Sequence, residues 1–420
     1  MTTGKFISRL IGLVGIKIKS FDLRPNLKRL DLFVKPLGNG CRCPECGRRG
    51  TIVKKRNRSR DLRCWKDIVI CGHQIFFWYA PKEITCPTHK RIQEEIPWSE
   101  VDGRITYRLE YRILAYGKIM TQKASAGLLK MASSTLSDLL HRAIERIRKG
   151  HKIRGVHTIG VDEISYQKGR KFVTIVYDLD KGCVLWVGKG KGRATIDEFF
   201  NNHLSRFQKN NIKWASCDMS DAYINGIKAH CPNVKLVLDR FHIVKALNEA
   251  LDDVRKEEWR KLSGNNKKAM KGLRWLLYRH STTRSKEETQ RLKELKKSNN
   301  RIYRAWVLKD EFEKFWEYLY TGCSEKFVTA WITRVLRSRI ESMKKFARTL
   351  RKNFDNVITF TEGQISNATA EGINRILKII KNRASGFRNV DSFIDMIFLV
   401  KGDLDILAQI PKKFKSMGLV

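Results

Sequence analysis

The sequence predicts an α+β protein of several domains, in which a mixed β-sheet core is interrupted by a helical segment. Three observations lead to this prediction: a cluster of cysteines near the N-terminus, a succession of apolar strands in the middle, and a long helical stretch rich in Lys, Arg, Glu and Trp. A chain of 420 residues is also long enough for roughly two to four folded units.

Composition and periodicity divide the chain into five segments. The first combines short apolar runs with Gly-rich turns and most of the cysteines, and the second is helical. The third alternates strands with helices, whereas the fourth and the fifth are helical by pattern. The expected boundaries are 1–95, 100–150, 155–241, 242–355 and 356–420.

The chain is strongly basic, with 84 Lys and Arg residues against 43 Asp and Glu residues and a formal net charge of +41. The basic residues are spread among apolar ones along the whole chain, which indicates folded domains with basic faces. We therefore expect a polyanionic partner. Nucleic acid is the first candidate, because neutralising phosphates releases counterions, and an anionic membrane surface is the second.

No run of about 18 apolar residues is present, so we expect no transmembrane helix. The segment 6–18 is apolar only at helical spacing and is followed by Lys19, which is unlike a signal peptide. A cytoplasmic protein is therefore expected, and its ten cysteines are not expected to form disulfides.

The motif Cys43-Pro-Glu-Cys46-Gly has the form of a metal knuckle, because two thiolates separated by two residues can hold one ion. Cys86 and His89 have the same spacing and would complete a tetrahedral site for a structural Zn²⁺. The strand-like runs 67–70 and 74–79 lie between the two pairs, so 1–95 is predicted to hold a β-rich zinc ribbon. Buried cysteines without metal are the alternative, and four residues compete as ligands: Cys41, Cys64, Cys71 and His73.

Residues 106–148 carry apolar side chains at helical spacing. Within them, 128–137 has the form of a helix, a short turn and a second helix capped by Ser133 or Ser134. A helix-turn-helix would turn early side chains of its second helix to the major groove, among them Thr135, Ser137 and His141. An ordinary helical hairpin fits the pattern equally well, and the charge and the neighbouring zinc ribbon favour DNA binding.

Five strand-like runs follow position 155. The first three, 156–161, 172–177 and 184–187, fit an antiparallel meander, and the last two, 212–217 and 234–238, alternate with helices. This order is that of an RNase H-like fold. Three acids stand directly after the first, fourth and fifth runs: Asp162, Asp218 and Asp239.

Carboxylates at the ends of central strands are held by rigid backbone near a sheet edge that a ligand can approach. Two of them, with a third from a packed helix, can hold two hard cations about 4 Å apart. Mg²⁺ suits such oxygen ligands, and Mn²⁺ is the expected substitute. We therefore predict that Asp162 and Asp218 bind metal. The alternative is a turn or cap role, which we expect for Asp178 and Asp180.

Seven motifs follow one another along the chain: Gly160-Val-Asp-Glu-Ile-Ser, Lys171-Phe-Val-Thr-Ile-Val, Val184-Leu-Trp-Val-Gly, Asp218-Met-Ser-Asp-Ala-Tyr, Asp239-Arg-Phe-His242, Asn367-Ala-Thr-Ala-Glu371-Gly-Ile-Asn374 and Arg383-Ala-Ser-Gly-Phe-Arg. Together they resemble the catalytic domain of the ISL-three family of bacterial insertion-sequence transposases. The cysteine knuckle and the helix-turn-helix also fall in the order of this family, so the resemblance spans almost the whole chain.

The resemblance implies a DDE-type transposase, which cleaves double-stranded DNA at the terminal inverted repeats of its element and joins it to target DNA. It implies that Asp162, Asp218 and Glu371 form the catalytic triad and hold two Mg²⁺ ions. A homodimer on DNA is expected, in the nucleoid of a bacterial cytoplasm and without a membrane partner.

Other residues of these motifs are expected near the same site. His242, in the element that begins at Asp239, either steers the DNA strand or caps the helix that starts there. Asn374 and Lys378 follow Glu371 on one helix face, which suits a metal and a phosphate together. Arg383 is a further accessory candidate from the last motif.

The stretch 242–355 is then an all-helical insertion in the RNase H-like core, and 356–420 carries the final helices of that core. Five tryptophans of the insertion are expected in its hydrophobic core rather than as base-stacking groups: Trp259, Trp275, Trp306, Trp316 and Trp331.

Two other functions compete with a transposase. A non-catalytic DNA-binding regulator derived from a transposase would keep the zinc ribbon and the helix-turn-helix without needing the acids, all three of which are present. An RNase H-like, structure-specific nuclease would share the acids but would not transfer strands.

Overall fold

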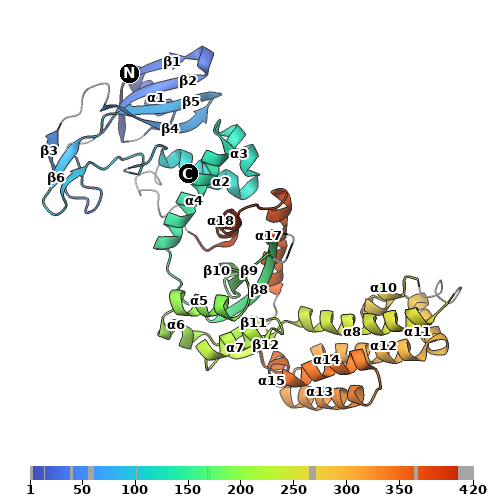
Figure 1. The fold of residues 1–420 in the computed structure, drawn as a ribbon. Coiled ribbons are helices and arrows are strands. Elements are labelled where there is room, and N and C mark those ends of the chain that lie inside the picture. The colour runs from blue at the N-terminus through green and yellow to red at the C-terminus, as the bar shows by residue number, and fades with distance from the viewer. Residues whose placement is uncertain are drawn as a thin grey trace. The chain divides into compact units, whose positions relative to one another are not determined.

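The computed structural model describes residues 3–13, 15–37, 41–54, 61–100, 102–167, 169, 171–263, 271–363 and 368–404. The chain forms two compact units, one of residues 1–152 with 377–420 and one of residues 153–376. Both combine strands with helices (Figure 1). No helix in the described ranges is long and apolar enough to cross a membrane.

The first unit contains two small sheets and a group of helices. Its elements are α1 (Thr3–Leu10), β1 (Ile16–Arg24), η1 (Pro25–Leu27), β2 (Arg29–Pro36), β3 (Thr51–Lys54), β4 (Arg63–Ile70), β5 (His73–Tyr79), β6 (Glu83–Cys86), β7 (Lys90–Gln93), α2 (Tyr107–Ile119), α3 (Gln122–Leu128), α4 (Ser133–Gly150), the end of α17 (Ala368–Arg383) and α18 (Val390–Lys401).

The four-stranded sheet of this unit has the order β1-β2-β5-β4. Strands β1 and β2 pair antiparallel, β5 lies parallel to β2, and β4 is antiparallel to β5. One face packs its apolar side chains around Trp98, including Leu32, Trp65 and Phe77. The expectation that 67–70 and 74–79 belong to the zinc ribbon is wrong. The two runs, in β4 and β5, pair with each other, and β5 pairs with β2, which precedes the cysteines, in a sheet separate from the ribbon.

The second sheet of the unit is a three-stranded antiparallel ribbon of order β3-β6-β7. Its small core consists of Cys41, Cys43, Ile84 and Cys86, with Ile92 packed against it. So little apolar surface cannot hold a ribbon together without a further cross-link. The cysteines in this core are therefore candidates for that cross-link.

Helices α2, α3, α4 and α18 pack together. Thr106 caps α2 by accepting the N–H of Leu109, and its hydroxyl donates to Asp67 of β4 over 2.5 Å. The buried Arg108 forms an ion pair with Asp67, which ties α2 to the sheet. Residues 377–404 thus lie with the predicted helix-turn-helix and not with the rest of the predicted core, because α18 buries its apolar face against α2 and α4.

The second unit consists of a five-stranded sheet and a long helical insertion. Its elements are β8 (Thr158–Gln167), β9 (Lys171–Asp178), β10 (Cys183–Lys189), α5 (Arg193–His203), α6 (Arg206–Asn211), β11 (Trp214–Cys217), α7 (Asp221–His230), β12 (Lys235–Leu238), α8 (Arg240–Lys261), α10 (Leu273–Tyr278), η3 (Ser281–Thr283), α11 (Lys286–Ser298), α12 (Asn300–Glu313), η4 (Lys314–Glu317), α13 (Thr321–Leu336), α14 (Glu341–Lys352), α15 (Phe354–Ile358), α16 (Phe360–Gly363) and the start of α17.

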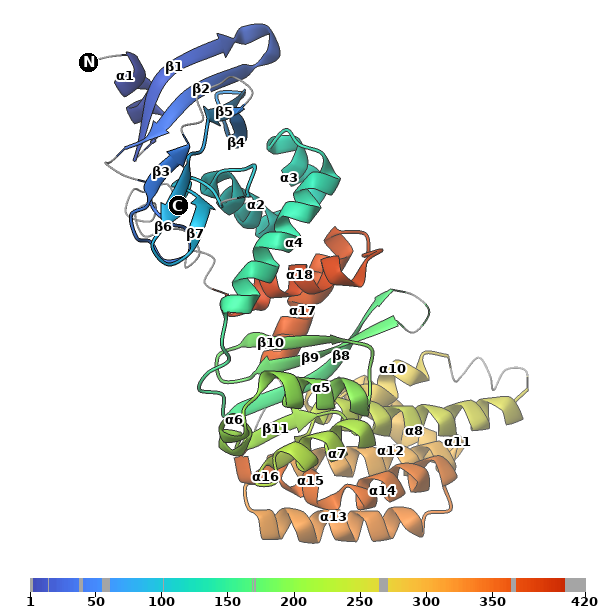
Figure 2. The same ribbon diagram turned by 60° about the vertical axis from the view of Figure 1, so that its left-hand side comes forward.

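The sheet has the order β10-β9-β8-β11-β12. Strands β8, β9 and β10 form the expected antiparallel meander, and β11 lies parallel to both β8 and β12. Helices α5, α6 and α7 lie along one face (Figure 2), where Phe199 and Tyr223 are fully buried against the strands. This arrangement brings the ends of three parallel strands, β8, β11 and β12, side by side.

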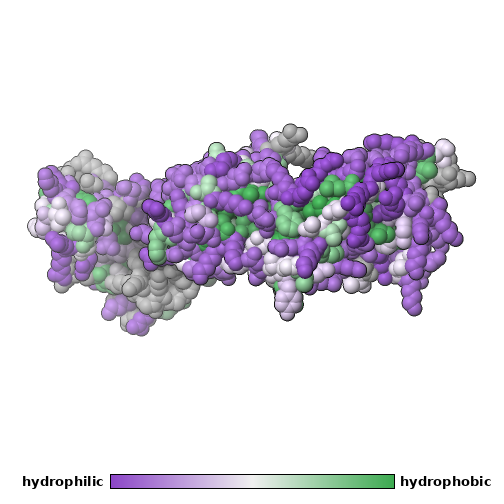
Figure 3. Space-filling model, turned by 90° about the horizontal axis from the view of Figure 1, so that it is seen from below, coloured by the Kyte–Doolittle hydropathy of each residue, from purple (hydrophilic) through white to green (hydrophobic). Residues whose placement is uncertain are grey.

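Helices α8 to α14 form a bundle around a shared hydrophobic core. The face of the molecule seen in Figure 3 is mostly hydrophilic, with hydrophobic patches between. Four of the bundle's five tryptophans pack in or against the core as predicted. The expectation is wrong for Trp275, which is 70% exposed on the short helix α10. Leu273, Leu276 and Leu277 supply the buried side of that helix, so no space is left for the indole there.

Candidate active site and zinc centre

Four predicted ligands come together beside the ribbon, with their ligand atoms all within 4.8 Å of one another: Cys43, Cys46, Cys86 and His89. The Sγ atoms of Cys46 and Cys86 lie 3.5 Å apart. Nδ1 of His89 lies 3.5 Å from Cys43 Sγ and 3.8 Å from Cys86 Sγ. Two sulfurs on a tetrahedral zinc with bonds of about 2.3 Å stand about 3.8 Å apart, so donors and spacing fit Zn²⁺.

Local backbone geometry presents these ligands. The knuckle turns at Gly47, where φ is +68°, and the Gly47 N–H donates to the carbonyl of Cys43 over 2.9 Å. In the second pair Cys86 is the last residue of β6, and the backbone N–H of His89 lowers the pKa of its thiol to about 6. A thiol with a lowered pKa is readily deprotonated, which is the form that binds metal.

The competing ligands lie outside this cluster. Burial raises the pKa of Cys41 to about 11, with a further contribution from Glu94, and burial also raises the pKa of Cys64 to about 11. Cys71 is exposed, and its carbonyl accepts from Nδ1 of His73 over 3.0 Å. These thiols therefore favour the neutral form or stand apart from the knuckle.

The predicted acids of the second unit stand at the ends of parallel strands. Residues 214–216 of β11 pair with 158–160 of β8, and continuing this register by two residues sets Asp218 beside Asp162. On the other side Cys217 pairs with Leu238, and the Asp239 N–H donates to the Cys217 carbonyl over 2.8 Å. Parallel strands in register turn equivalent side chains to the same face, so three carboxylates share one level of the sheet.

The carboxylate of Asp162 is held from two sides. The Glu163 backbone N–H donates to one oxygen over 2.7 Å, and the Asn374 amide donates to the other over 2.6 Å. The hydroxyl of Tyr177 donates to the Asn374 amide oxygen over 2.5 Å and fixes its orientation. Burial raises the pKa of Asp162 despite these hydrogen bonds, an effect that a nearby cation would oppose.

Asp218 accepts the Ser220 backbone N–H over 3.0 Å, and burial raises its pKa as well. Asp239 caps α8 by accepting the N–H of Phe241 over 2.9 Å. His242 does not cap the helix; its Nε2 lies 3.7 Å from the Asp239 carboxylate. The imidazole is also close enough to lower the pKa of Asp162 and Asp218, which opposes the larger effect of burial.

Glu371 is exposed in the first turn of α17. Asn374 follows one turn later on the same face and reaches Asp162, so α17 presents this face to the acid-bearing end of β8. Within the described ranges, the zinc ligands are the one group of three or more such atoms this close together. Asp162, Asp218 and Glu371 do not form such a group in this structure.

One supporting residue at the site, Tyr177, was not singled out by sequence, whereas Glu163 was expected on the opposite side of the strand from Asp162. Tyr177 was predicted only as a strand residue of the core, because no local sequence pattern indicates that its buried hydroxyl would reach Asn374. Glu163 projects to the other side of β8, where its carboxylate accepts from the Tyr223 hydroxyl over 2.7 Å and lies 3.9 Å from the Lys191 ammonium. The position of Glu163 directly after a candidate ligand is only a weak signal that its side chain contacts other residues near the site.

Helices α3 and α4, joined by a short turn, form the predicted helical pair, and α4 buries Leu136, Leu140 and Ile144. The prediction of a capping Ser133 or Ser134 is wrong, because position 132 is the N-cap and its alanine side chain forms no cap hydrogen bond. Near the start of α4 Thr135 is exposed and Ser137 is half-buried.

His141 of the same helix has a partner within the first unit. Its Nδ1 lies 2.7 Å from the Asp395 carboxylate of α18, which raises the pKa of the imidazole. The Arg148 guanidinium, two turns later, stacks on the Phe398 ring at 3.9 Å. The face of α4 that includes His141 is therefore engaged by α18, and the exposed residues before it remain available.

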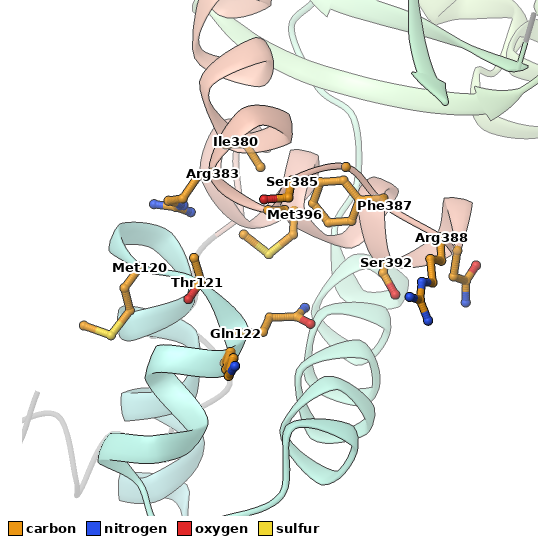
Figure 4. A pocket seen from close by; sticks show the side chains of 14 residues that line it. Met120, Thr121, Gln122, Ile380, Arg383, Ser385, Phe387, Arg388, Ser392 and Met396 are labelled. Atoms are coloured by element: carbon orange, nitrogen blue, oxygen red, sulfur yellow. The ribbon is translucent and has the colours of Figure 1, made fainter. Parts of the chain in front are cut away.

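The last motif, which begins at Arg383, contacts the end of α2 in the first unit. Arg383 donates to the carbonyls of Lys118 and Gly117 at the end of α2, over 3.2 and 3.3 Å. Beside it, the loop between α17 and α18 and the turn before α3 line a cavity of about 450 Å³ (Figure 4). Lys378 is exposed on α17. In the structure Arg383 thus supports the helices of the first unit.

Acids at the ends of parallel strands, a strongly basic chain and a Cys/His cluster are features typical of metal-using enzymes that act on nucleic acids. The family of DDE transposases of the ISL-three type, described as transposase, matches residues 159–397. This match covers more than half of the chain, so the protein belongs to this family of DNA-cleaving and strand-transferring enzymes.

Relatives support the same assignment over most of the chain. The transposase for insertion sequence element IS1001 of Bordetella parapertussis is 26% identical over 399 residues, which cover 94% of this chain and 97% of the relative. The transposase for insertion sequence element IS1557 of Mycobacterium tuberculosis is 23% identical over 385 residues, 85% of either chain.

One solved structure, the Drosophila P element transposase strand transfer complex, covers 71% of this chain and 92% of its own at 10% identity. Its TM-score of 0.35 is too low to carry an argument about the fold.

Proposed function

We propose that this protein is the transposase of an insertion sequence and that it binds the terminal inverted repeats of that element as double-stranded DNA. The observation that carries the proposal is the register that sets Asp162 beside Asp218 in a protein with a net charge of +41. Lys and Arg supply affinity for phosphates, and the acids supply the reaction centre. The strand order supports an RNase H-like core with an insertion from α8 onward.

In this proposal Asp162, Asp218 and Glu371 hold two divalent ions, Mg²⁺ or Mn²⁺. Carboxylate oxygens suit these hard cations. Burial raises the pKa of Asp162 and of Asp218, and a bound cation would oppose that effect. When bound, such ions stabilise the attacking and leaving oxygens of a phosphodiester. Asp239 shares their level in the sheet but also caps α8, which assigns it a supporting role.

The protein's own groups then orient the centre. The Glu163 and Ser220 backbone N–H groups fix the first two carboxylates, and Asn374 fixes the rotamer of Asp162 from α17. His242, beside the acids, is placed to donate a hydrogen bond to a DNA phosphate near them. The exposed start of α4, including Thr135, is the proposed duplex-reading surface, and two copies of the chain are expected to hold the two element ends.

Asn374→Ala is expected to lower strand cleavage by about 10- to 100-fold and to shift the Mg²⁺ requirement to higher concentration. The physical reason is that Asp162 loses the hydrogen bond that orients it, and supports of this kind typically contribute that much to metal affinity or activity. Cleavage rate against Mg²⁺ concentration is the measurement. Asn382→Ala, an exposed change on the same helix, is the control, and an unchanged Mg²⁺ curve for Asn374→Ala would contradict the role.

The function itself is tested with purified protein and labelled duplexes that carry the inverted repeats flanking the gene. A transposase cleaves these ends and joins them to a second duplex. Binding without cleavage would identify a regulator, and cleavage of branched substrates without joining would identify a nuclease. Sedimentation of the protein–DNA complex gives the number of chains on each end.

A further inference from the structure

The four-stranded sheet of the first unit has a second face that its hydrophobic core does not use. In the parallel pair β2–β5, Phe33 stands opposite Trp78 and Asp31 opposite Phe76. Side chains alternate along a strand, so these residues project away from Leu32, which lies in the core. The rings of Phe33 and Trp78 stack 6.4 Å apart at 23°, and both are half-buried. A platform of aromatic rings therefore lies outside the core.

Positive charge surrounds these rings. The Arg29 guanidinium lies 4.1 Å from the centre of the Phe76 ring. Two acids stand on this face, and both are paired with arginines. Asp22 of β1, opposite Asp31, lies 2.7 Å from Arg24 Nε. Asp31 accepts from Arg29 Nε and Nη2 over 2.8 Å each and from Trp78 Nε1 over 2.6 Å. Burial opposes its charge, but these hydrogen bonds lower the pKa of Asp31. Lys19 and Lys35, on β1 and β2, are exposed.

A cavity of about 430 Å³ opens beside the platform. This size is within the range of small-ligand sites, about 300–1,000 Å³. Glu94 in its wall is buried and accepts from the Tyr79 hydroxyl over 2.6 Å and from the Lys82 N–H over 2.7 Å. The lining offers aromatic rings, ammonium groups and a carboxylate acceptor, including Lys19, Phe33, Lys35, Trp78, Lys82 and Glu94.

We propose that this face binds a single strand of DNA, with unpaired bases stacked on Trp78 and Phe33 and phosphates paired with the surrounding lysines. Rings that lie in a sheet can stack on bases only where those bases are unpaired, because duplex bases cover each other's faces. Basic side chains around an aromatic platform suit a nucleic-acid strand rather than an apolar partner. The proposed function enters this inference only in the choice of DNA as the nucleic acid.

The test measures binding of labelled oligothymidylate and of a labelled duplex to the full chain by fluorescence anisotropy, without added Mg²⁺. Trp78→Ala is expected to weaken single-strand binding by about 5- to 100-fold and to leave duplex binding within about twofold. Trp78→Phe keeps a ring and is expected to stay within about threefold of the parent. Phe207→Ala, which removes a 74% exposed ring from the other unit, is the control and should change neither affinity.

The contribution of Lys19 and Lys35 is measured separately, through the salt dependence of single-strand affinity. Lys19→Ala combined with Lys35→Ala is expected to reduce the slope of log affinity against log salt by about 1.4 for the single strand, since each phosphate contact contributes about 0.7. Zinc content and thermal unfolding show whether a variant is folded. If Trp78→Ala disturbs the fold by leaving Asp31 without its indole donor, Phe33→Ala against Phe33→Leu repeats the ring test.

Three results would overturn the proposal: single-strand affinity unchanged in folded Trp78→Ala or Phe33→Ala, equal losses for single strand and duplex, or a changed sedimentation coefficient with unchanged affinity. The last would show that the face packs on a second copy of the chain. No cleavage step enters these measurements, so failure of the proposed active site would leave their outcome intact.

Discussion

Replacing Asp162 or Asp218 with asparagine is expected to lower strand cleavage by about 1,000-fold or more and to leave binding to element ends unchanged. Asparagine keeps the shape of the side chain but removes the charge that holds a divalent ion. Loss of several kcal/mol of charge stabilisation at the reacting phosphate corresponds to a rate change of this size. The Lys and Arg residues that supply affinity are untouched, and removal of one acid reduces repulsion of phosphate.

The measurement is cleavage and joining of labelled end duplexes in Mg²⁺, with gel-shift binding in parallel. Glu371→Gln should behave like the two aspartate variants. Glu163→Gln is the matched control, because Glu163 lies on the other side of β8 with Tyr223. Asp239→Asn keeps the helix cap, since Asn caps as well as Asp. If the Asp218 variant cleaved fully and the Asp239 variant did not cleave, Asp239 would be the metal ligand and Asp218 the supporting residue.

Replacing Cys43 or Cys86 with serine is expected to release the zinc, unfold the ribbon and abolish binding specific to element ends. The ribbon's apolar core is too small to hold β3, β6 and β7 without the ion. Structural zinc contributes about 10–16 kcal/mol of apparent binding energy in zinc-finger peptides, and that energy is folding energy. The second unit has its own core and should remain folded and retain non-specific affinity for DNA.

Zinc per chain is measured by metal analysis, and the fold of the ribbon by limited proteolysis. Cys64→Ser and Cys323→Ser are the controls, because both thiols lie outside the ligand cluster. One full zinc in a Cys43→Ser, Cys46→Ser double variant would refute the site. If the His89→Ala variant kept its zinc and the Cys41→Ser variant lost it, Cys41 and not His89 would be the fourth ligand.

Local sequence was enough to predict the strands of the central sheet and the acids that end them. Apolar runs of four to six residues, bounded by Gly-containing turns, specify strands by themselves, and Asp162 and Asp218 follow such runs directly. The pairing of strands was also predictable for the meander, because short turns leave β8 and β9 one way to pair. Glu371 was different: its helix was predictable, but its role came from the resemblance.

The cysteine cluster shows how much local spacing predicts and where prediction from it ends. Two residues between Cys43 and Cys46, and between Cys86 and His89, predicted each half of the site because a short turn fixes the distance between its ends. The strands between the halves were assigned to the wrong sheet, since the pairing of β5 with β2 joins residues more than 40 positions apart. No local pattern encodes which earlier strand a later one will meet.

The sequence by itself thus determined the class of each segment, the knuckle and the strand-end acids, because these depend on residue type and short spacing. Only the tertiary structure decided which side chains meet across the chain. Asn374 reaches Asp162 over 212 positions, and Asp395 holds His141 over 254. Such contacts depend on how whole elements pack. That packing depends on the burial of apolar faces over each whole unit, and no single motif contains this information.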